Sequence, residues 1–215
     1  MRHHAVIASS NPGKLIEIKR LLNPLGFDLS NQDELGLDPP PETGLTFIEN
    51  ALAKARAASR ATGLPALADD SGLEVDALGG APGVHSARFA GSQGNDQANI
   101  AKLLAELESR KTPDRRARFR CLIVYLPHAA HPAPLIADGT WEGLIGMQPC
   151  GTQGFGYDPI FYLPRHGCTA AELSAADKDR LSHRGQALRK LCALLRATTD
   201  PGRHATADTC RGISR

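Results

Sequence analysis

Residues 5–22 read AVIASSNPGKLIEIKRLL: a short apolar run, a polar loop with a glycine, and an amphipathic segment follow one another directly. The apolar run at 5–8 is typical of a short buried strand. A helical stripe follows the loop, formed by Leu15, Ile18, Leu21 and Leu22. The Asn-Pro pair and the glycine at 23–26 end this helix. A strand that passes at once into a helix favours an α/β fold.

The remaining chain alternates helices and strands and then becomes richer in strands. Thr46 and Glu49 form a capping box that predicts a helix from Phe47 to about Ala61, ended by Gly63. Other expected features are a stiff proline loop at 38–41, strands at 64–68, 121–126 and 160–163, a loop at 79–95, a helix capped by Asn95 or Asp96, a hairpin over 135–147 that turns at Asp138-Gly139, a second capping box at Thr169 and Glu172, and a last helix with Leu188, Leu191 and Leu195 on one face. This order predicts an α/β protein with a mixed sheet.

Length and composition restrict the classes of protein. The 215 residues suit one domain or one domain with two lobes, and 41% hydrophobic and 22% charged residues are ordinary for a globular chain. The net charge is only +2 and aromatic residues are 5%. Both values argue against a surface built to bind nucleic acid. We expect one domain over 1–197 and a disordered tail over 198–215, where the apolar pattern stops.

The cysteines and the apolar segments indicate the compartment. The cysteines are Cys121, Cys150, Cys168, Cys192 and Cys210, an odd number without a C-x-x-C pair. This pattern predicts neither a disulfide framework nor a zinc site, and reduced thiols fit the cytosol. No apolar run is long enough for a signal peptide core or a membrane span. We therefore expect a cytoplasmic protein without a membrane partner.

The loop at 9–14 has the composition of a phosphate site. A glycine-containing loop at a helix N-terminus presents free N–H groups and the positive end of the helix dipole, and two hydroxyls, an amide and an ammonium join them here. The loop is not a Walker A motif, because Ala8 and Leu15 stand where that motif needs glycine and Ser or Thr. The alternative is an ordinary strand–helix turn with a surface lysine.

Three further segments carry candidate chemistry. Asp69-Asp70-Ser71-Gly72 follows an expected strand, and adjacent acids on a strand point to opposite faces, so one carboxylate can hold a magnesium ion or activate water. Residues 154–159 read GFGYDP, in which Phe155 could stack on a base. Lys178 and residues 182–185 add cations and hydrogen-bond donors. The alternatives are an Asp-Ser-Gly turn, a tight turn with a core aromatic, and a solvated helix face.

Five segments together resemble one family. They are SSNPGKLIEIKRLL, ETGLTFIENALAKARAA, ADDSGLEVDALGGAPGVHSARFAG, GTQGFGYDPIF and AELSAADKDRLSHRGQAL, in this order between residues 5 and 196. They are similar to the inosine/xanthosine triphosphate pyrophosphatases, also called Ham1-like or non-canonical purine NTP pyrophosphatases. The resemblance implies an elongated α/β fold with a mixed central sheet, two lobes with a nucleotide cleft between them, and a homodimer. It implies hydrolysis of ITP, dITP and XTP to the monophosphate and pyrophosphate with Mg²⁺.

The resemblance also implies roles for individual residues. Asp70 would be the general base and a metal ligand, Glu42 a second metal ligand, and Asp69, Lys14 and Lys54 would join Asp70 in catalysis. The triphosphate would be held by Ser9, Ser10, Asn11, Pro12, Gly13 and Lys14. Other substrate contacts would come from Ser71, Phe155, Gly156, Tyr157, Asp158, Lys178, His183 and Arg184. Ser10 stands where members of the family often carry glycine; it crowds the loop slightly and adds a donor.

Two other functions fit part of the same pattern. A Maf-like nucleotide pyrophosphatase would share the chemistry but act on other bases, and a substrate panel separates it from this family. A nucleotide sensor would bind without hydrolysis. The Asp69-Asp70 pair and Lys14 argue against a sensor, and release of pyrophosphate would exclude it.

Overall fold

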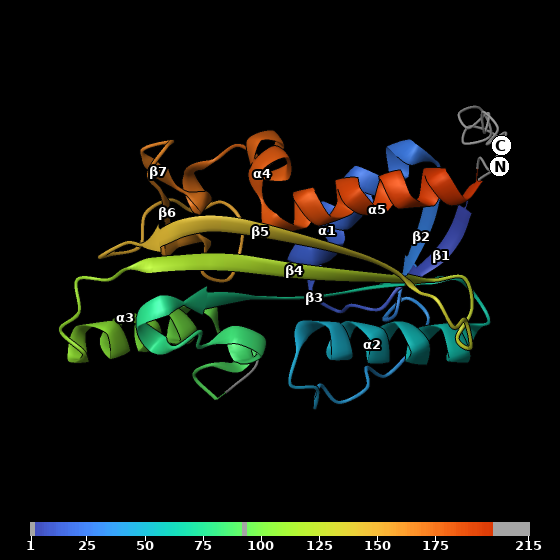
Figure 1. The fold of residues 1–215 in the computed structure, drawn as a ribbon, viewed down its shortest axis with the longest axis horizontal. Helices are drawn as coiled ribbons and strands as arrows, with labels where there is room; N and C mark the ends of the chain where they lie inside the picture. The colour runs from blue at the N-terminus through green and yellow to red at the C-terminus, as the bar shows by residue number, and fades with distance from the viewer. Residues whose placement is uncertain (1–2, 92–93, 200–215) are drawn as a thin grey trace, which may run out of the picture.

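A seven-stranded mixed sheet forms the centre of the computed structural model, which describes residues 3–91 and 94–199. The strand order is β2-β1-β3-β4-β5-β6-β7; β1 pairs in parallel with β2 and β3, and the other pairs are antiparallel. The strands are β1 (His3–Ile7), β2 (Phe27–Asn31), β3 (Ala66–Val75), β4 (Arg116–Leu126), β5 (Leu135–Ile145), β6 (Phe161–Leu163) and β7 (Cys168–Thr169). Strands β3, β4 and β5 run along the longest axis of the molecule (Figure 1). The predicted mixed α/β sheet and its elongated shape are confirmed.

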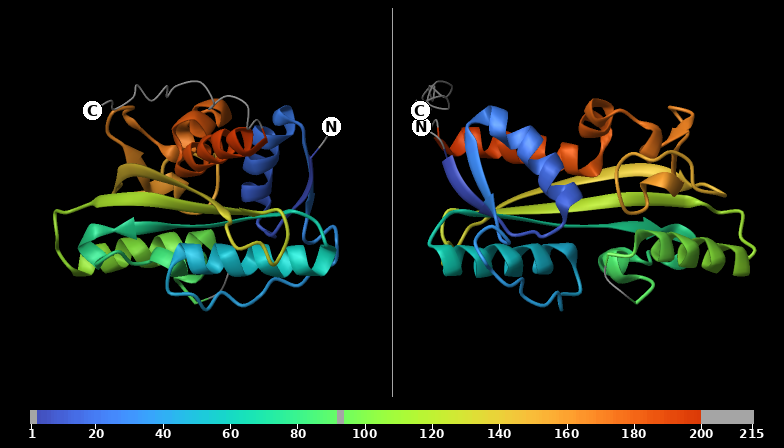
Figure 2. Two further views of the ribbon diagram at one scale, coloured as in Figure 1. Left: turned by 45° about the vertical axis from the view of Figure 1, so that its right-hand side comes forward. Right: turned by 180° about the vertical axis from the view of Figure 1, so that it is seen from behind.

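Helices cover both faces of the sheet (Figures 1 and 2). They are α1 (Pro12–Leu22), α2 (Phe47–Thr62), α3 (Asp96–Ser109), α4 (Ala175–Leu181) and α5 (His183–Thr199). Helices α1, α4 and α5 lie on one face, and α2 and α3 lie on the other. Among residues 3–91 and 94–199, no helix has the length and apolarity needed to cross a membrane. The tail was expected from residue 198, but residues 198 and 199 belong to α5; residues 200–215 lie outside the described part.

Strand alternation divides the core between the two faces. Ala5 and Ile7 of β1 pack with α1 and α5, whereas Val6 packs with α2. The same alternation continues along β3, where Leu67 joins the α1/α5 cluster and Ala68 joins the α2 cluster. Two consecutive residues further along β3 therefore face different sets of helices. This alternation is what separates the two acids of the candidate site.

The predicted caps of α2 and α3 are confirmed, whereas α1 begins at Pro12, inside the expected loop. Asn11 caps α1, its side chain accepting a hydrogen bond from the Lys14 amide. Thr46 and Glu49 form the complete capping box of α2, which ends at Gly63 in a left-handed conformation. Asn95 caps α3. The second predicted capping box, at Thr169 and Glu172, is also present and starts a single 3-10 turn, η5 (Ala170–Glu172).

Two predicted strand boundaries were wrong. The hairpin at Asp138-Gly139 was wrong: β5 runs unbroken through Leu135–Ile145, and Gly139 is there because the α5 backbone passes over it. A Cβ on Gly139 would lie 1.9 Å from the His183 carbonyl oxygen. Likewise β3 does not end near Ala68 but continues to Val75. Strand β2 was not predicted. The 3-10 helix η3 (Gly83–Arg88) was not predicted either, and it lies inside the expected loop at 79–95.

Candidate active site

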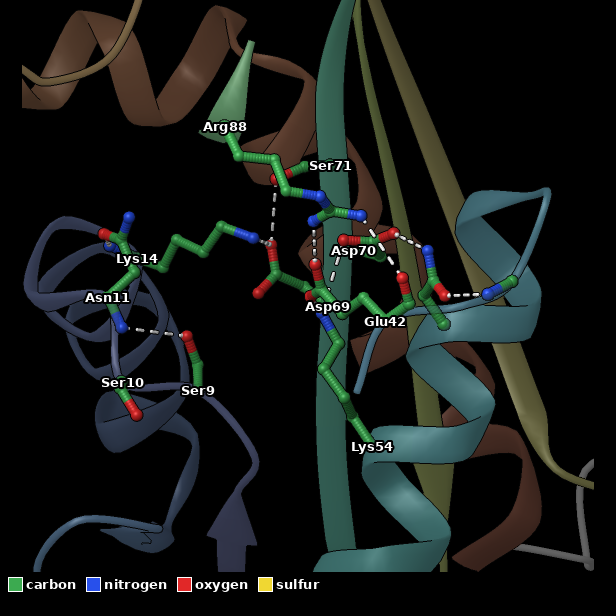
Figure 3. A network of polar contacts seen from close by, with 12 residues as sticks. Ser9, Ser10, Asn11, Lys14, Glu42, Lys54, Asp69, Asp70, Ser71 and Arg88 are labelled. Carbon is green, nitrogen blue, oxygen red and sulfur yellow. Dashed lines mark hydrogen bonds and ion pairs between the residues drawn. The ribbon is translucent and has the colours of Figure 1, made fainter. Parts of the chain in front are cut away.

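Asp69 and Asp70 sit side by side in the middle of β3 and point to opposite faces of the sheet (Figure 3). Asp69 is fully buried toward α1 and α5, where Lys14 and Arg184 reach it. Asp70 is buried toward α2, where Lys54 and Asn50 reach it. The prediction that the two acids face different partners is confirmed. Two separate networks of charge therefore meet at one strand.

The Asp70 network joins β3 to α2 and to the loop before it. The Lys54 ammonium lies 3.2 Å from Asp70 Oδ1 and 2.9 Å from Glu42 Oε1, so that it links the two carboxylates. Asn50 Nδ2 donates to the other oxygen of Asp70 at 3.1 Å. Arg88 closes the network, with Nη1 2.9 Å from Glu42 Oε2. Two acids and two cations are thus balanced in a largely buried site.

Burial and charge act against each other in this network. Burial raises the pKa of Asp70 above its ordinary value, although Lys54 and Lys14 oppose the shift. Burial would also raise the pKa of Glu42, but Lys54 and Arg88 outweigh it and the pKa is lowered. Burial disfavours the charged form of Lys54, yet the surrounding carboxylates, Asp70 first among them, raise its pKa. Lys54 is therefore a fixed positive charge between two acids.

The Asp69 network is a line of six charged side chains of alternating sign. In order they are Lys14, Asp69, Arg184, Glu17, Lys178 and Asp158. Asp69 Oδ2 lies 3.1 Å from both Lys14 Nζ and Arg184 Nη2. Arg184 also pairs with Glu17, and Lys178 Nζ lies 2.9 Å from Glu17 and 2.5 Å from Asp158. The line connects Lys14, in the first turn of α1, with the loop that carries Phe155.

The ion pairs keep this line charged in spite of its burial. Burial alone would raise the pKa of Asp69, but the adjacent Lys14 and Arg184 hold it well below its usual range. Glu17 behaves in the same way, since Arg184 and Lys178 outweigh its burial and lower its pKa. One oxygen of Asp69, Oδ1, is buried without a hydrogen-bond partner among the described residues.

The loop before α1 presents several groups of the kind predicted for phosphate binding. Ser9 Oγ accepts a hydrogen bond from the main-chain amide of Asn11, and the side-chain oxygen of Asn11 accepts one from the main-chain amide of Lys14. Ser10 is turned away from the acids (Figure 3): its hydroxyl donates to Asp33 at 2.7 Å and accepts from Gln32 Nε2. Pro12 is the first residue of α1. The N-terminus of α1 and the Lys14 ammonium therefore face Asp69.

The loop at 154–158 packs against the start of α1. A Cβ on Gly13 would lie 2.3 Å from Phe155 Cδ1, so the glycine makes room for the ring. Lys178 Nζ lies 4.7 Å from the centre of that ring and the Arg184 guanidinium carbon 5.6 Å. Gly156 donates its amide to Asp96 at 2.6 Å. Phe155 thus lies between Gly13 and two cations of the Asp69 network, Lys178 and Arg184.

His183 and Tyr157 are buried beside this loop. The His183 ring stacks on Phe119, with ring centres 4.7 Å apart and planes at 11°. Burial, together with the charges of Arg184 and Lys178, holds the pKa of His183 well below 6.5. Its Nδ1 is the second buried atom without a hydrogen-bond partner among the described residues. Tyr157 donates its hydroxyl to the Ser86 carbonyl at 2.9 Å.

Many of the residues singled out in the sequence belong to these two networks, which start from Asp69 and Asp70 of β3, whereas Ser10 points elsewhere. Ser71, which follows the two acids, receives a hydrogen bond from Arg184 Nη2 at 2.9 Å. Sequence reasoning did not find Glu17 or Arg88, which complete the two networks. Glu17 had a detectable signal, because it lies on the α1 face that also carries Leu21, where an acid is unusual. Arg88 had no detectable signal, because it ends a short 3-10 helix whose sequence has no periodic apolar pattern.

The donor set fits a magnesium ion. Carboxylate oxygens are the protein ligands that Mg²⁺ prefers, and Asp70 and Glu42 already share one cation, the Lys54 ammonium. Within residues 3–91 and 94–199 no cluster of three or more His, Cys, Asp or Glu side chains is placed to hold a metal ion, so an ion here would have only these two carboxylates as protein ligands. Such an ion would complete its shell with water and phosphate oxygens, as is usual for Mg²⁺.

Comparisons with known proteins agree on one family. The Ham1 family model matches residues 5–194. A dITP/XTP pyrophosphatase of Shigella flexneri is 55% identical over 191 residues, covering 89% of this chain and 97% of the relative, and one of Yersinia pseudotuberculosis is 56% identical with the same coverage. A solved HAM1 protein of Coxiella burnetii matches with a TM-score of 0.84 and 49% identity, covering 91% of this chain and 99% of the other.

Proposed function

The chain belongs to the Ham1 family, and from this premise we propose that it hydrolyses non-canonical purine nucleoside triphosphates to the monophosphate and pyrophosphate. The substrates are ITP, dITP and XTP. The observation that carries the proposal is that Lys54 contacts both Asp70 and Glu42, while the neighbouring Asp69 contacts Lys14 at the start of α1. One side of this arrangement suits a metal and water, and the other suits phosphate.

The triphosphate binds at the N-terminus of α1. Free amides at a helix start and the positive end of the dipole attract phosphate oxygens. Ser9, Asn11 and Gly13 line this turn, and the Lys14 ammonium adds a full positive charge. During bond cleavage, negative charge grows on the departing pyrophosphate. Lys14 and the loop amides stabilise this charge because they are held in place before the reaction.

Asp70 activates the water. It accepts a proton from the water that attacks phosphorus, and the bond to the departing pyrophosphate breaks. Burial raises the pKa of Asp70, which makes it a better proton acceptor than an exposed carboxylate. Lys54 and Asn50 fix its orientation. Asp70 and Glu42 would hold Mg²⁺, which neutralises phosphate charge when bound.

The base lies near Phe155 and the cations of the Asp69 network. Phe155 stacks on the purine, and this contact is the same for every base. Selectivity comes from donors such as Lys178, Arg184 and His183, which expect the 6-keto group of hypoxanthine or xanthine. Adenine has an amino group there and cannot accept from these donors, so each hydrogen bond made to the keto group is lost, at a cost of roughly 1–3 kcal/mol. Several such groups together give strong discrimination.

Two further expectations rest on the family resemblance. We propose that the enzyme is a homodimer with two lobes around the nucleotide and that it acts in the cytoplasm. The cysteines of the described residues, Cys121, Cys150, Cys168 and Cys192, are all free thiols. Free thiols are what a reducing compartment favours.

The experiment that tests the function is pyrophosphate release from a panel of nucleotides with Mg²⁺. We expect rapid release from ITP, dITP and XTP and slow release from ATP and GTP. Faster release of pyrophosphate from nucleotides with other bases would favour the Maf-like alternative. Tight binding of ITP with no release would make the protein a sensor.

A further inference from the structure

The 3-10 helix η3 (Gly83–Arg88) is attached to the strand that carries both acids. Gly72 of β3 leaves room for it, because a Cβ there would lie 2.3 Å from the Gly83 carbonyl oxygen and 2.6 Å from Ser86 Oγ. The buried Ser86 hydroxyl accepts from the Leu73 amide at 2.9 Å and donates to the Gly83 carbonyl at 2.6 Å. One serine side chain therefore fixes η3 to β3, directly after Asp69, Asp70 and Ser71.

The same helix reaches the loop of Phe155. The Tyr157 hydroxyl donates to the Ser86 carbonyl oxygen, and the Tyr157 side chain is only 4% exposed. Burial raises the pKa of this hydroxyl, so it stays a neutral donor. Tyr157 follows Phe155 by two residues. The position of the Phe155 loop relative to β3 thus depends on a main-chain atom of η3.

The other end of η3 reaches Glu42. Arg88, its last residue, contacts Glu42 twice: Nη1 lies 2.9 Å from the carboxylate, and Nη2 donates to the Glu42 carbonyl oxygen at 3.2 Å. The guanidinium therefore fixes both the side chain and the backbone of Glu42. The loop continues to Gly44, whose amide donates to Asn50 at 2.8 Å, and Asn50 in turn holds Asp70.

We propose that η3 is the positioning element of the whole site, setting the Phe155 loop through the Ser86 carbonyl and Glu42 through Arg88. Tyr157 and Arg88 are then positioning residues, which act on the substrate through Phe155 and Glu42. That Tyr157 acts where the base binds, and Arg88 where the metal binds, rests on the proposed function. The mechanical link itself does not, since it concerns the free protein.

The test is amide hydrogen exchange of the free protein, without nucleotide or metal, in four variants. Tyr157→Phe should speed exchange in residues 154–158 only, and Arg88→Leu in residues 42–46 only. Ser86→Ala, which loosens η3 from β3, should speed exchange in both segments by about fivefold or more, because it removes two hydrogen bonds and the loss of one gives about that factor. Ser59→Ala is the control, because Ser59 is also buried and its hydroxyl donates to the Leu64 carbonyl oxygen, which belongs neither to η3 nor to either segment.

The inference is overturned if Ser86→Ala, with a cooperative thermal transition, speeds neither segment or only one of them. It is also overturned if Tyr157→Phe speeds exchange in residues 42–46 as much as in 154–158. The two single variants keep the test decisive even if Ser86→Ala does not fold. These results stand whether or not the parent releases pyrophosphate, so failure of this inference and failure of the proposed function are seen separately.

Activity gives a second readout that mere loss of stability would not change. Tyr157→Phe should raise KM for ITP by about threefold or more and leave kcat within about twofold, because it disturbs where the base rests and not the reacting groups. A lowered kcat with unchanged KM would contradict the assignment of Tyr157 to the base end.

Discussion

Replacing Arg184 with methionine should destabilise the whole fold, and not only remove a substrate contact. Arg184 is 1% exposed, and its guanidinium bonds Asp69, Glu17 and Ser71. Methionine keeps much of the volume but removes the charge. The line of six alternating charges then has three acids and two cations, so that one buried negative charge is uncompensated.

The loss of stability in Arg184→Met depends on the ion pairs that remain. Breaking a buried ion pair by removing one partner typically costs about 3–5 kcal/mol. After the change Asp69 still pairs with Lys14 and Glu17 still pairs with Lys178. Because each acid still contacts a cation, although Glu17 and Asp158 share Lys178, we expect the lower end of that range, about 3 kcal/mol. This is a large part of the 5–15 kcal/mol that typical domains have.

The assay is urea unfolding of the parent, Arg184→Met and the double variant Glu17→Gln with Arg184→Met. The double variant restores charge balance, so it should recover at least about 1 kcal/mol of the loss. Arg116→Met is the control, since Arg116 pairs with Asp114 on the surface and its loss should leave the urea midpoint close to that of the parent. Equal stability of Arg184→Met and the parent, or a further loss in the double variant, would refute this reading of the network.

Three further changes test other parts of the structure. Burial holds the pKa of His183 well below 6.5, so only the unfolded chain takes up this proton as the pH falls below 6.5. The free energy of unfolding should therefore fall between pH 6.5 and 5 by up to about 1.4 kcal/mol per pH unit. In urea unfolding, His183→Gln should lose that part of the pH dependence. Gly139→Ala should cost about 1–3 kcal/mol or more, measured by thermal melting, because the new Cβ collides with the α5 backbone; a melting temperature equal to that of the parent would contradict the close approach. Thr46→Ala should cost about 1 kcal/mol in urea unfolding by removing the α2 cap, and no change would mean that Glu49 caps α2 without it.

The sequence predicts the elements whose signals are local. The stripe after the phosphate loop and the capping box at Thr46 each lie within one helix, and both helices formed where expected. The Asp138-Gly139 pair was misread because a glycine that makes room for a distant helix looks the same in sequence as a glycine in a turn. Strand β2 was missed because FDLSN has only a weak apolar alternation and its parallel partner, β1, lies before an entire helix.

The site shows the same limit. The opposite orientation of Asp69 and Asp70 follows from strand alternation alone, and so it could be predicted. That Arg184 binds Asp69 could not, because the two residues lie 115 positions apart. The close approach of Glu42 to Arg88 likewise depends on an irregular loop and a 3-10 helix, for which no periodic pattern exists.

The most direct test of the account is pyrophosphate release from ITP by Asp70→Asn, measured with Mg²⁺ beside the parent. The amide keeps the size of the side chain and can still meet Asn50, but it cannot accept the proton of the water or supply charge to a metal. We expect a folded protein, as judged by its thermal transition, whose kcat is at least about a hundredfold lower. A folded Asp70→Asn variant that releases pyrophosphate at near the parent rate would contradict the account.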